Sequence, residues 1–154
     1  MMTHFLVLLS TMTLSAIRRL SSNARNEMKS KMIIFGGNGY VGQNIIKAAN
    51  EICNDIDIVC ISRSGGKNVK KDKFSNVSWI EGDLTGGDES WKSHLTEASC
   101  AISCVGAFGS NSHMEKVNGD ANINAISSCL KAGVGRFTFI STVDNNLPSF
   151  VLSG

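Results

Sequence analysis

The chain of 154 residues is long enough for one globular domain with its own core, and its composition of 42% hydrophobic and 18% charged residues excludes a disordered or collagen-like protein. A net charge of +2 and the lack of a stripe of basic and aromatic residues exclude a nucleic-acid-binding surface as the first interpretation. The five cysteines form no C-x-x-C pair, and no cysteine and histidine residues have the spacing of a zinc site. We therefore expect reduced cysteines and no bound metal.

Residues 1–30 differ in composition from the rest of the chain. An apolar stretch over residues 5–17 is followed by Arg18, Arg19 and further basic residues, and Glu27 is the single acid. The apolar stretch is too short for a transmembrane helix, and a basic, serine-rich, acid-poor leader is typical of organellar transit peptides. We predict that residues 1–30 are a targeting leader without fixed structure, mitochondrial first and plastid as the alternative. A secretory signal is disfavoured because no Lys or Arg precedes the apolar stretch, and an N-terminus without an address remains a further alternative.

Residues 31–154 alternate between apolar, β-branched runs and stretches with helical spacing. Buried parallel strands read as such apolar runs, so the alternation predicts an α/β fold with a doubly wound, Rossmann-like parallel sheet of about five strands. In chain order, the expected elements are a strand at 32–35, a helix at 40–52, strands at 56–61 and 77–80, a helix at 88–98, a strand at 99–105, a helix at 112–132 and a strand at 136–142.

Three helix details follow from the same patterns. Asp88 is expected to cap the second helix, and Gly133 to end the third. The buried face of the first helix is expected to contain Val41, Ile45, Ile46, Ala49 and Ile52, and that of the third Met114, Val117, Ala121, Ala125 and Leu130.

A glycine-rich turn joins the first expected strand to the first helix. Gly36, Gly39 and Gly42 have the spacing G-x-x-G-x-x-G between a buried strand and an amphipathic helix, which is the context of a dinucleotide-binding loop. One glycine permits the tight turn, one lets the backbone approach a pyrophosphate, and one lets the helix pack on the strand. A glycine turn without a ligand is the alternative. The predicted cofactor-binding residues here are Gly36, Gly39, Tyr40, Val41 and Gly42.

The second expected strand ends at Ser62 and Arg63, about 20 residues after the glycine motif, where dinucleotide-binding proteins read the adenosine ribose. An acid there would accept hydrogen bonds from the ribose of NAD, whereas a cationic side chain suits the 2′-phosphate of NADP. We therefore expect Ser62 and Arg63 to bind NADP, with NAD as the second choice. After the third strand, Asp83 and Leu84 are expected either to contact adenine or, for Asp83, only to cap a turn.

Taken together, these motifs resemble those of the atypical and extended short-chain dehydrogenase/reductases over residues 31–154. Segments 104–107, 117–126 and 136–142 are similar to the fourth strand end, the following helix and the fifth strand of that family. The resemblance implies that Val105, Gly106 and Ala107 line the cofactor. It also implies that Ser141 or Thr142 orients a substrate carbonyl.

One departure from the family pattern concerns catalysis. Active members use a Tyr-x-x-x-Lys pair after the fifth strand, whereas the single tyrosine of this chain, Tyr40, lies within the glycine loop. We therefore expect the sequence to represent the N-terminal part of a longer fold, and its own catalytic activity stays open.

Two functions fit these observations. The first is an NADP-dependent oxidoreductase or epimerase, which the resemblance to organellar relatives links to ubiquinone biosynthesis or respiratory-chain assembly. The second is a non-catalytic nucleotide-binding accessory protein of a membrane-associated complex. Both imply a dinucleotide partner, no nucleic acid and no transmembrane helix.

Overall fold

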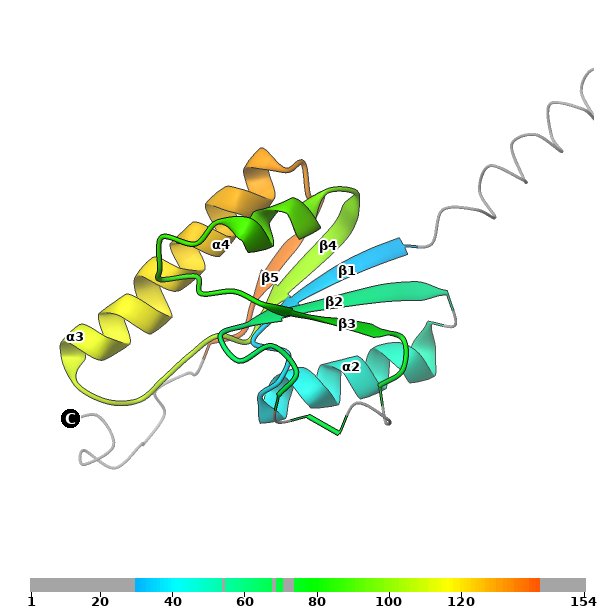
Figure 1. The fold of residues 1–154 in the computed structure, drawn as a ribbon, viewed down its shortest axis with the longest axis horizontal. Coiled ribbons are helices and arrows are strands. Elements are labelled where there is room, and N and C mark those ends of the chain that lie inside the picture. The colour runs from blue at the N-terminus through cyan, green and yellow to red at the C-terminus, as the bar shows by residue number, and fades with distance from the viewer. Residues whose placement is uncertain (1–29, 54, 68, 71–73, 142–154) are drawn as a thin grey trace, which may run out of the picture.

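A computed structural model describes residues 30–53, 55–67, 69–70 and 74–141, so residues 1–29 of the expected leader and Thr142 lie outside the described residues, and Ser30 begins the first strand. The described part contains a five-stranded sheet in the order β3-β2-β1-β4-β5, in which every pair of neighbours is parallel (Figure 1). This is the doubly wound, Rossmann-like arrangement that the sequence predicts. The strands are β1 (Ser30–Phe35), β2 (Ile56–Ser62), β3 (Val77–Glu81), β4 (Ala98–Ser103) and β5 (Phe137–Phe139).

Helices cover both faces of the sheet (Figure 1). The apolar residues of one face pack with α2 and those of the other with η2 and α4, so neighbouring residues of β1 such as Ile34 and Phe35 belong to different core clusters. Burial on both faces explains why the central strands read as continuous apolar runs. The helical elements are α2 (Tyr40–Ile52), the 3-10 helix η2 (Ser90–Leu95), α3 (Asn111–Met114), the π-helical turn η3 (Glu115–Asp120) and α4 (Ala121–Lys131).

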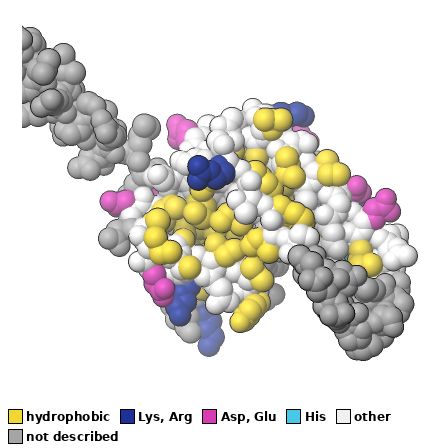
Figure 2. Space-filling view, turned by 180° about the vertical axis from the view of Figure 1, so that it is seen from behind, with side chains coloured by type: hydrophobic (Ala, Val, Ile, Leu, Met, Phe, Trp, Pro, Cys, Tyr) yellow, Lys and Arg dark blue, Asp and Glu magenta, His cyan; other side chains and the backbone are white. Residues whose placement is uncertain are grey.

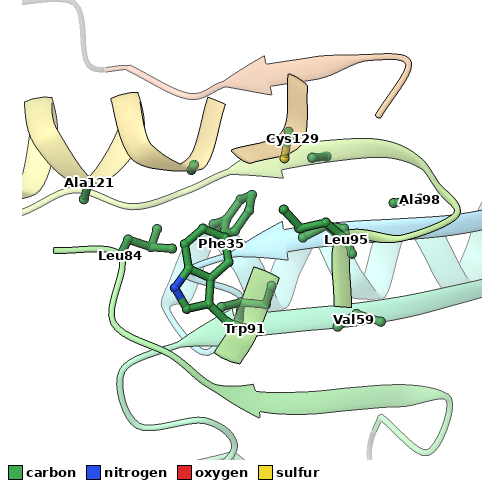
Figure 3. Packing of buried hydrophobic residues seen from close by; sticks show 12 residues of the cluster. Phe35, Val59, Leu84, Trp91, Leu95, Ala98, Ala121 and Cys129 are labelled. Atoms are coloured by element: carbon green, nitrogen blue, oxygen red, sulfur yellow. The ribbon is translucent and has the colours of Figure 1, made fainter. Parts of the chain in front are cut away.

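An aromatic pair lies at the centre of the larger core cluster (Figure 3). Phe35 of β1 and Trp91 of η2 are both fully buried, and their rings meet edge to face with centroids 5.7 Å apart. A Cβ atom on Gly82 would lie 2.8 Å from Cβ of Trp91, so the chain leaving β3 passes close to the indole because this residue is a glycine. The core packing therefore fixes where the segment after β3 begins.

The second expected helix is shorter and tighter than predicted. Residues 90–95 form a 3-10 helix rather than an α-helix over 88–98, and Glu89 rather than Asp88 occupies the N-cap. The carboxylate of Asp88 still accepts hydrogen bonds from the Ser90 amide, at 2.9 Å, and the Ser90 hydroxyl, at 3.0 Å. Asp88 therefore closes the turn that leads into η2, but it stands one residue before the N-cap rather than at the N-cap.

Three residues assigned to buried helix faces are exposed instead. Val41, Ile52 and Leu130 are 44%, 80% and 78% exposed, although Ile46, Ala49, Ala121 and Ala125 are buried as predicted. Val41 and Ile52 lie near the two ends of α2, whereas Leu130 directly follows the buried Cys129 and so lies on the face of α4 that is turned away from the core. The expected end at Gly133 is confirmed, because its φ of +77° lets the Val134 amide reach the Cys129 carbonyl at 3.0 Å.

The last two strands are also shorter than predicted. β4 ends at Ser103 instead of Val105, and β5 covers residues 137–139 of the expected 136–142. Residues 105–107 leave the sheet where side chains of η3 and α4 bind their backbone, as described below. The cysteines among the described residues are free, and burial raises the pKa of Cys60 to about 12 and that of Cys129 to about 11.

Several hydrophobic side chains remain on the surface. Figure 2 shows hydrophobic side chains gathered near the middle of the face that is turned away from the viewer in Figure 1. β5 is an edge strand, and Phe139 at its end is 43% exposed, as Ile126 of α4 is. Among the described residues, no helix is both long and apolar enough to cross a membrane.

Candidate functional site

A cavity of about 460 Å³ opens where the carboxyl ends of β1 to β4 meet. The chain leaves β1 toward β2 and β3 on one side of the sheet and adds β4 on the other, so this edge is the topological switch point at which α/β sheets bind ligands. The lining residues are Gly36, Asn38, Gly39, Ile61, Ser62, Arg63, Ser64, Gly82, Asp83, Leu84, Thr85, Cys104, Val105, Gly106, Val117 and Ala121.

The glycine turn forms the floor of this cavity. Gly36 has a φ of +73°, which side chains rarely allow, and a Cβ atom there would lie 3.2 Å from the Cys104 carbonyl. The Gly36 amide donates to the Ile61 carbonyl at 2.8 Å, and the Gly39 amide donates back to the Gly36 carbonyl at 3.0 Å. The turn is therefore tied both to β2 and to itself.

Gly42 lets α2 approach the turn closely. A Cβ atom on Gly42 would lie 2.5 Å from Cα of Gly37 and 2.6 Å from the carbonyl oxygen of Gly36, and both of these are backbone atoms. Gly42 does not line the cavity, and neither do Tyr40 and Val41, which are 85% and 44% exposed. Gly42 thus acts through packing, as the motif predicts for one of its glycines.

The N-terminus of α2 has the features of an anion-binding site. Gly39 is the N-cap, no side chain caps the helix and no acid stands in its first turn. The first amides of a helix have no partner within the helix, and the helix dipole favours negative charge at this end. With Gly36 and Gly39 leaving backbone open to the cavity, the residues present fit a pyrophosphate group.

The turn after β2 presents hydrogen-bond donors to the cavity. Ser62 is buried, and its hydroxyl donates to the Gly65 carbonyl at 3.0 Å, so it closes the turn. The guanidinium of Arg63 is exposed at the cavity, and the residues from Ser62 to Lys67 include no acid. The end of β2 therefore lacks the carboxylate acceptor that recognises the ribose hydroxyls of NAD.

Asp83 closes the turn after β3. Its Oδ1 atom accepts hydrogen bonds from both the amide and the hydroxyl of Thr85, each at 2.9 Å. These bonds, with a smaller contribution from the nearby Arg63, lower the pKa of Asp83. The next residue, Leu84, is 6% exposed, belongs to the core and also lines the cavity. Asp83 therefore caps this turn, its contact with adenine stays a prediction, and Leu84 supplies an apolar wall.

The segment after β4 is held by two asparagines of the following helical stretch. The Asn118 side chain accepts from the Ala107 amide at 2.8 Å and donates to the Ala107 carbonyl at 3.0 Å. Asn122 is buried, accepts from the Ser103 hydroxyl at 2.6 Å and donates to the Val105 carbonyl at 3.2 Å. These bonds pair the backbone of residues 105–107 with η3 and α4 instead of extending the sheet.

A smaller cavity of about 150 Å³ adjoins the first at Val105 and Gly106. Ser141 lines it together with Ala107, and Ala107 does not reach the larger cavity. Of the residues predicted for catalysis, Ser141 thus lies near the predicted cofactor-lining segment, and Thr142 lies outside the described residues. None of the described residues forms a group of three or more His, Cys, Asp or Glu side chains that could hold a metal ion.

Several cavity residues were missed by the sequence analysis. Asn38 lies inside the glycine motif and could have been included on position alone, whereas Ser64, Thr85 and Val117 reach the cavity only because the chain folds. Cys104 also lines the cavity, and burial raises the pKa of its thiol, so it adds no negative charge there.

The packing of Gly42 leads to a testable prediction. Gly42→Ala places a methyl group against backbone atoms of the turn, so we expect the free energy of unfolding to fall by about 1–3 kcal/mol. Gly119→Ala is the matched control, because Gly119 is also helical and a Cβ atom there meets nothing within 4 Å. Denaturant unfolding followed by circular dichroism measures both. Equal stability of the two variants would contradict the close approach of α2 to the turn.

Comparison with known proteins shows relatives of the same architecture. The chain is 38% identical over 123 residues to a protein of Arabidopsis thaliana described as uncharacterized and chloroplastic, and the match covers 80% of this chain and 40% of the relative. Similar solved structures include the PbgP3 protein of Burkholderia pseudomallei (TM-score 0.62, 21% identity, 75% of this chain and 36% of that one) and the Bordetella bronchiseptica enzyme WbmG in complex with NAD and UDP (TM-score 0.57, 20% identity, 74% and 38%).

The chain thus spans about two fifths of the length of these relatives. The structural likeness supports the Rossmann-like fold. The family itself rests on the sequence, because the model of the 3-beta hydroxysteroid dehydrogenase/isomerase family matches residues 33–151, from β1 past the end of β5. The chain therefore belongs to the 3-beta hydroxysteroid dehydrogenase/isomerase family.

Proposed function

We propose that this chain binds NAD(P)(H) through the larger cavity, as part of a short-chain dehydrogenase/reductase-type protein. The observation that carries the proposal is that one cavity unites Gly36 and Gly39 at the N-terminus of α2 with the cation Arg63 and the apolar Leu84. In a dinucleotide site, a helix N-terminus binds the pyrophosphate, a residue at the end of the second strand binds the adenosine ribose, and an apolar wall packs on the adenine. The structure of the relative WbmG was determined with NAD, which agrees with this class of ligand.

NADP is the cofactor that the charges of this site favour. Arg63 follows the end of β2 and lines the cavity. Among the described residues, no hydrogen bond or ion pair joins its guanidinium to another residue. A guanidinium binds a phosphate through strong, charge-assisted hydrogen bonds. The Ser62 hydroxyl donates its proton within its own turn, and as a neutral acceptor it replaces a carboxylate only weakly. We therefore propose NADP(H) as the preferred cofactor.

The remaining predicted residues are assigned to different parts of the dinucleotide. We propose that Asp83 and Leu84 lie beside adenine, and that Val105, Gly106 and Ala107 face the nicotinamide half. Ser141 lines the adjoining small cavity, where a hydroxyl donor would orient a substrate carbonyl. The cofactor, when bound, supplies a hydride acceptor or donor.

Two functions of the whole protein follow from this site. An oxidoreductase or epimerase is the first, in keeping with the family. A non-catalytic nucleotide-binding accessory protein is the alternative, since nucleotide binding by itself requires no catalytic residue. Turnover of NADPH with carbonyl substrates separates the two. Links to ubiquinone biosynthesis or to a membrane-associated complex rest on the resemblance alone and stay predictions.

The role of Arg63 is tested by charge removal. Arg63→Ala takes away the cation at the expected 2′-phosphate, so we expect NADPH to bind about tenfold more weakly and NADH to bind nearly as before. Isothermal titration calorimetry measures both constants. Arg136→Ala is the control, because Arg136 precedes β5, at the amino ends of the strands and away from the cavity. A loss of NADH binding as large as that of NADPH would refute the assignment.

We also propose that residues 1–30 direct the protein to an organelle, with the plastid favoured over the mitochondrion. The basic, acid-poor composition supports import, and the chloroplastic description of the Arabidopsis thaliana relative supports the plastid.

A fusion of residues 1–30 to a fluorescent protein tests this address in plant cells. We expect the fluorescence to overlap with chlorophyll. A fusion in which Arg18, Arg19 and Arg25 are replaced by Glu is the control and should remain in the cytosol, because transit peptides are poor in acids. Fluorescence in mitochondria would restore the mitochondrial prediction, and diffuse fluorescence of the unaltered fusion would reject a targeting leader.

A further inference from the structure

A side-chain hydrogen bond joins the two loops that line the larger cavity. The Asn38 side-chain amide donates to the Ser64 hydroxyl oxygen at 2.7 Å, although the two residues lie 26 positions apart. Asn38 belongs to the glycine turn after β1, Ser64 to the turn after β2, and both line the cavity. The bond therefore links the expected pyrophosphate site to the expected ribose site.

The direction of this bond decides what Ser64 offers to a ligand. A serine hydroxyl has one proton to donate and two lone pairs to accept with. Because the Asn38 amide donates, it occupies one lone pair and leaves the hydroxyl proton available. Among the described residues, no acceptor for that proton is found, and Ser64 is partly exposed to the cavity. Ser64 therefore presents a free donor beside Arg63.

The position of this donor is fixed from two sides. The turn that carries it is closed by the Ser62 hydroxyl on the Gly65 carbonyl, at 3.0 Å, and by the Gly65 amide on the Ser62 carbonyl, also at 3.0 Å. Asn38 is held by the Gln43 side chain, which donates to the backbone carbonyl of Asn38 at 2.8 Å. A donor that is already in place loses little conformational entropy when a ligand binds.

The charges around the turn suit an anion. The nearest acid on β3, Glu81, forms an ion pair with Lys67 at 2.8 Å. The carboxylate of Asp83 accepts two hydrogen bonds from Thr85 and lies near the cations Arg63 and Lys116. An incoming phosphate would therefore meet a cation and a hydroxyl donor rather than an unpaired carboxylate.

We propose that Ser64 is a specificity-determining residue that binds the 2′-phosphate of NADP together with Arg63, and that Asn38 is the positioning residue that directs the Ser64 hydroxyl proton. This inference rests on the proposed function, namely that the cavity binds a dinucleotide. A hydrogen bond to a phosphate is stronger than one to a neutral ribose hydroxyl. Ser64 consequently contributes more to the binding of NADP than to that of NAD.

The test uses the full 154-residue chain with two probes of the adenosine half, 2′,5′-ADP and 5′-ADP, in titration calorimetry. We expect Ser64→Ala to weaken 2′,5′-ADP binding about tenfold and 5′-ADP binding less than about twofold. Ser64→Thr keeps the hydroxyl and should keep most of the affinity. Ser78→Ala, an exposed serine of β3 outside the cavity, is the matched control and should change neither constant.

The positioning role of Asn38 is tested by a double-mutant cycle. Asn38→Ala should also weaken 2′,5′-ADP selectively, and the variant with both substitutions should bind no more weakly than Ser64→Ala alone, because Asn38 acts through Ser64. Additive losses, or equal losses for both probes, would overturn this role.

The failures of the two proposals are distinguishable. If the unaltered chain binds neither probe, both the proposed function and this inference are wrong. If it binds both probes but Ser64→Ala changes their affinities equally or not at all, the nucleotide site stands and the role of Ser64 is refuted.

Discussion

The approach of α2 to the glycine turn is the contact on which the site depends. Because Gly42 has no side chain, the first turn of the helix lies directly against the backbone of Gly36 and Gly37. This contact sets the direction of the helix axis and points the uncapped N-terminus of α2 at the cavity. The same turn is bonded to β2 through the Gly36 amide, so the helix, β1 and β2 are fixed relative to one another at the carboxyl edge of the sheet.

Around this fixed point, each of the other three strands that end at the cavity is followed by a segment that side chains hold in place. Ser62 closes the turn after β2, Asp83 closes the turn after β3, and Asn118 and Asn122 hold the segment after β4. Ser62 and Asn122 are buried, and buried polar groups that are satisfied in this way rigidify the backbone that they bind. The side chains left to meet a ligand are then few, and Arg63 with Ser64 is the polar pair among them.

The features that sequence reasoning predicted well are those encoded locally. The alternation of strands and helices along the chain, α2 and the glycine turn follow from apolar periodicity and from glycines at fixed spacing, and Arg63 follows from its place at the end of a strand. The bond between Asn38 and Ser64, the passage of Gly82 beside Trp91, and the departure of residues 105–107 from the sheet depend on partners far along the chain, which periodicity cannot reveal. The exposure of Leu130 has the same origin, since only the packing decides which face of α4 lies against the sheet.

Solution NMR of the isotopically labelled full chain during titration with NADPH tests the central claim most directly. The account predicts that amides of the glycine turn, including Gly36 and Gly39, and those of Arg63 and Ser64 shift together with a single saturation curve. The amide of Gly133, at the end of α4 and away from the cavity, should stay unchanged. Unshifted amides in the glycine turn at saturating NADPH, or shifts confined to other parts of the chain, would contradict a nucleotide site at the carboxyl edge of the sheet.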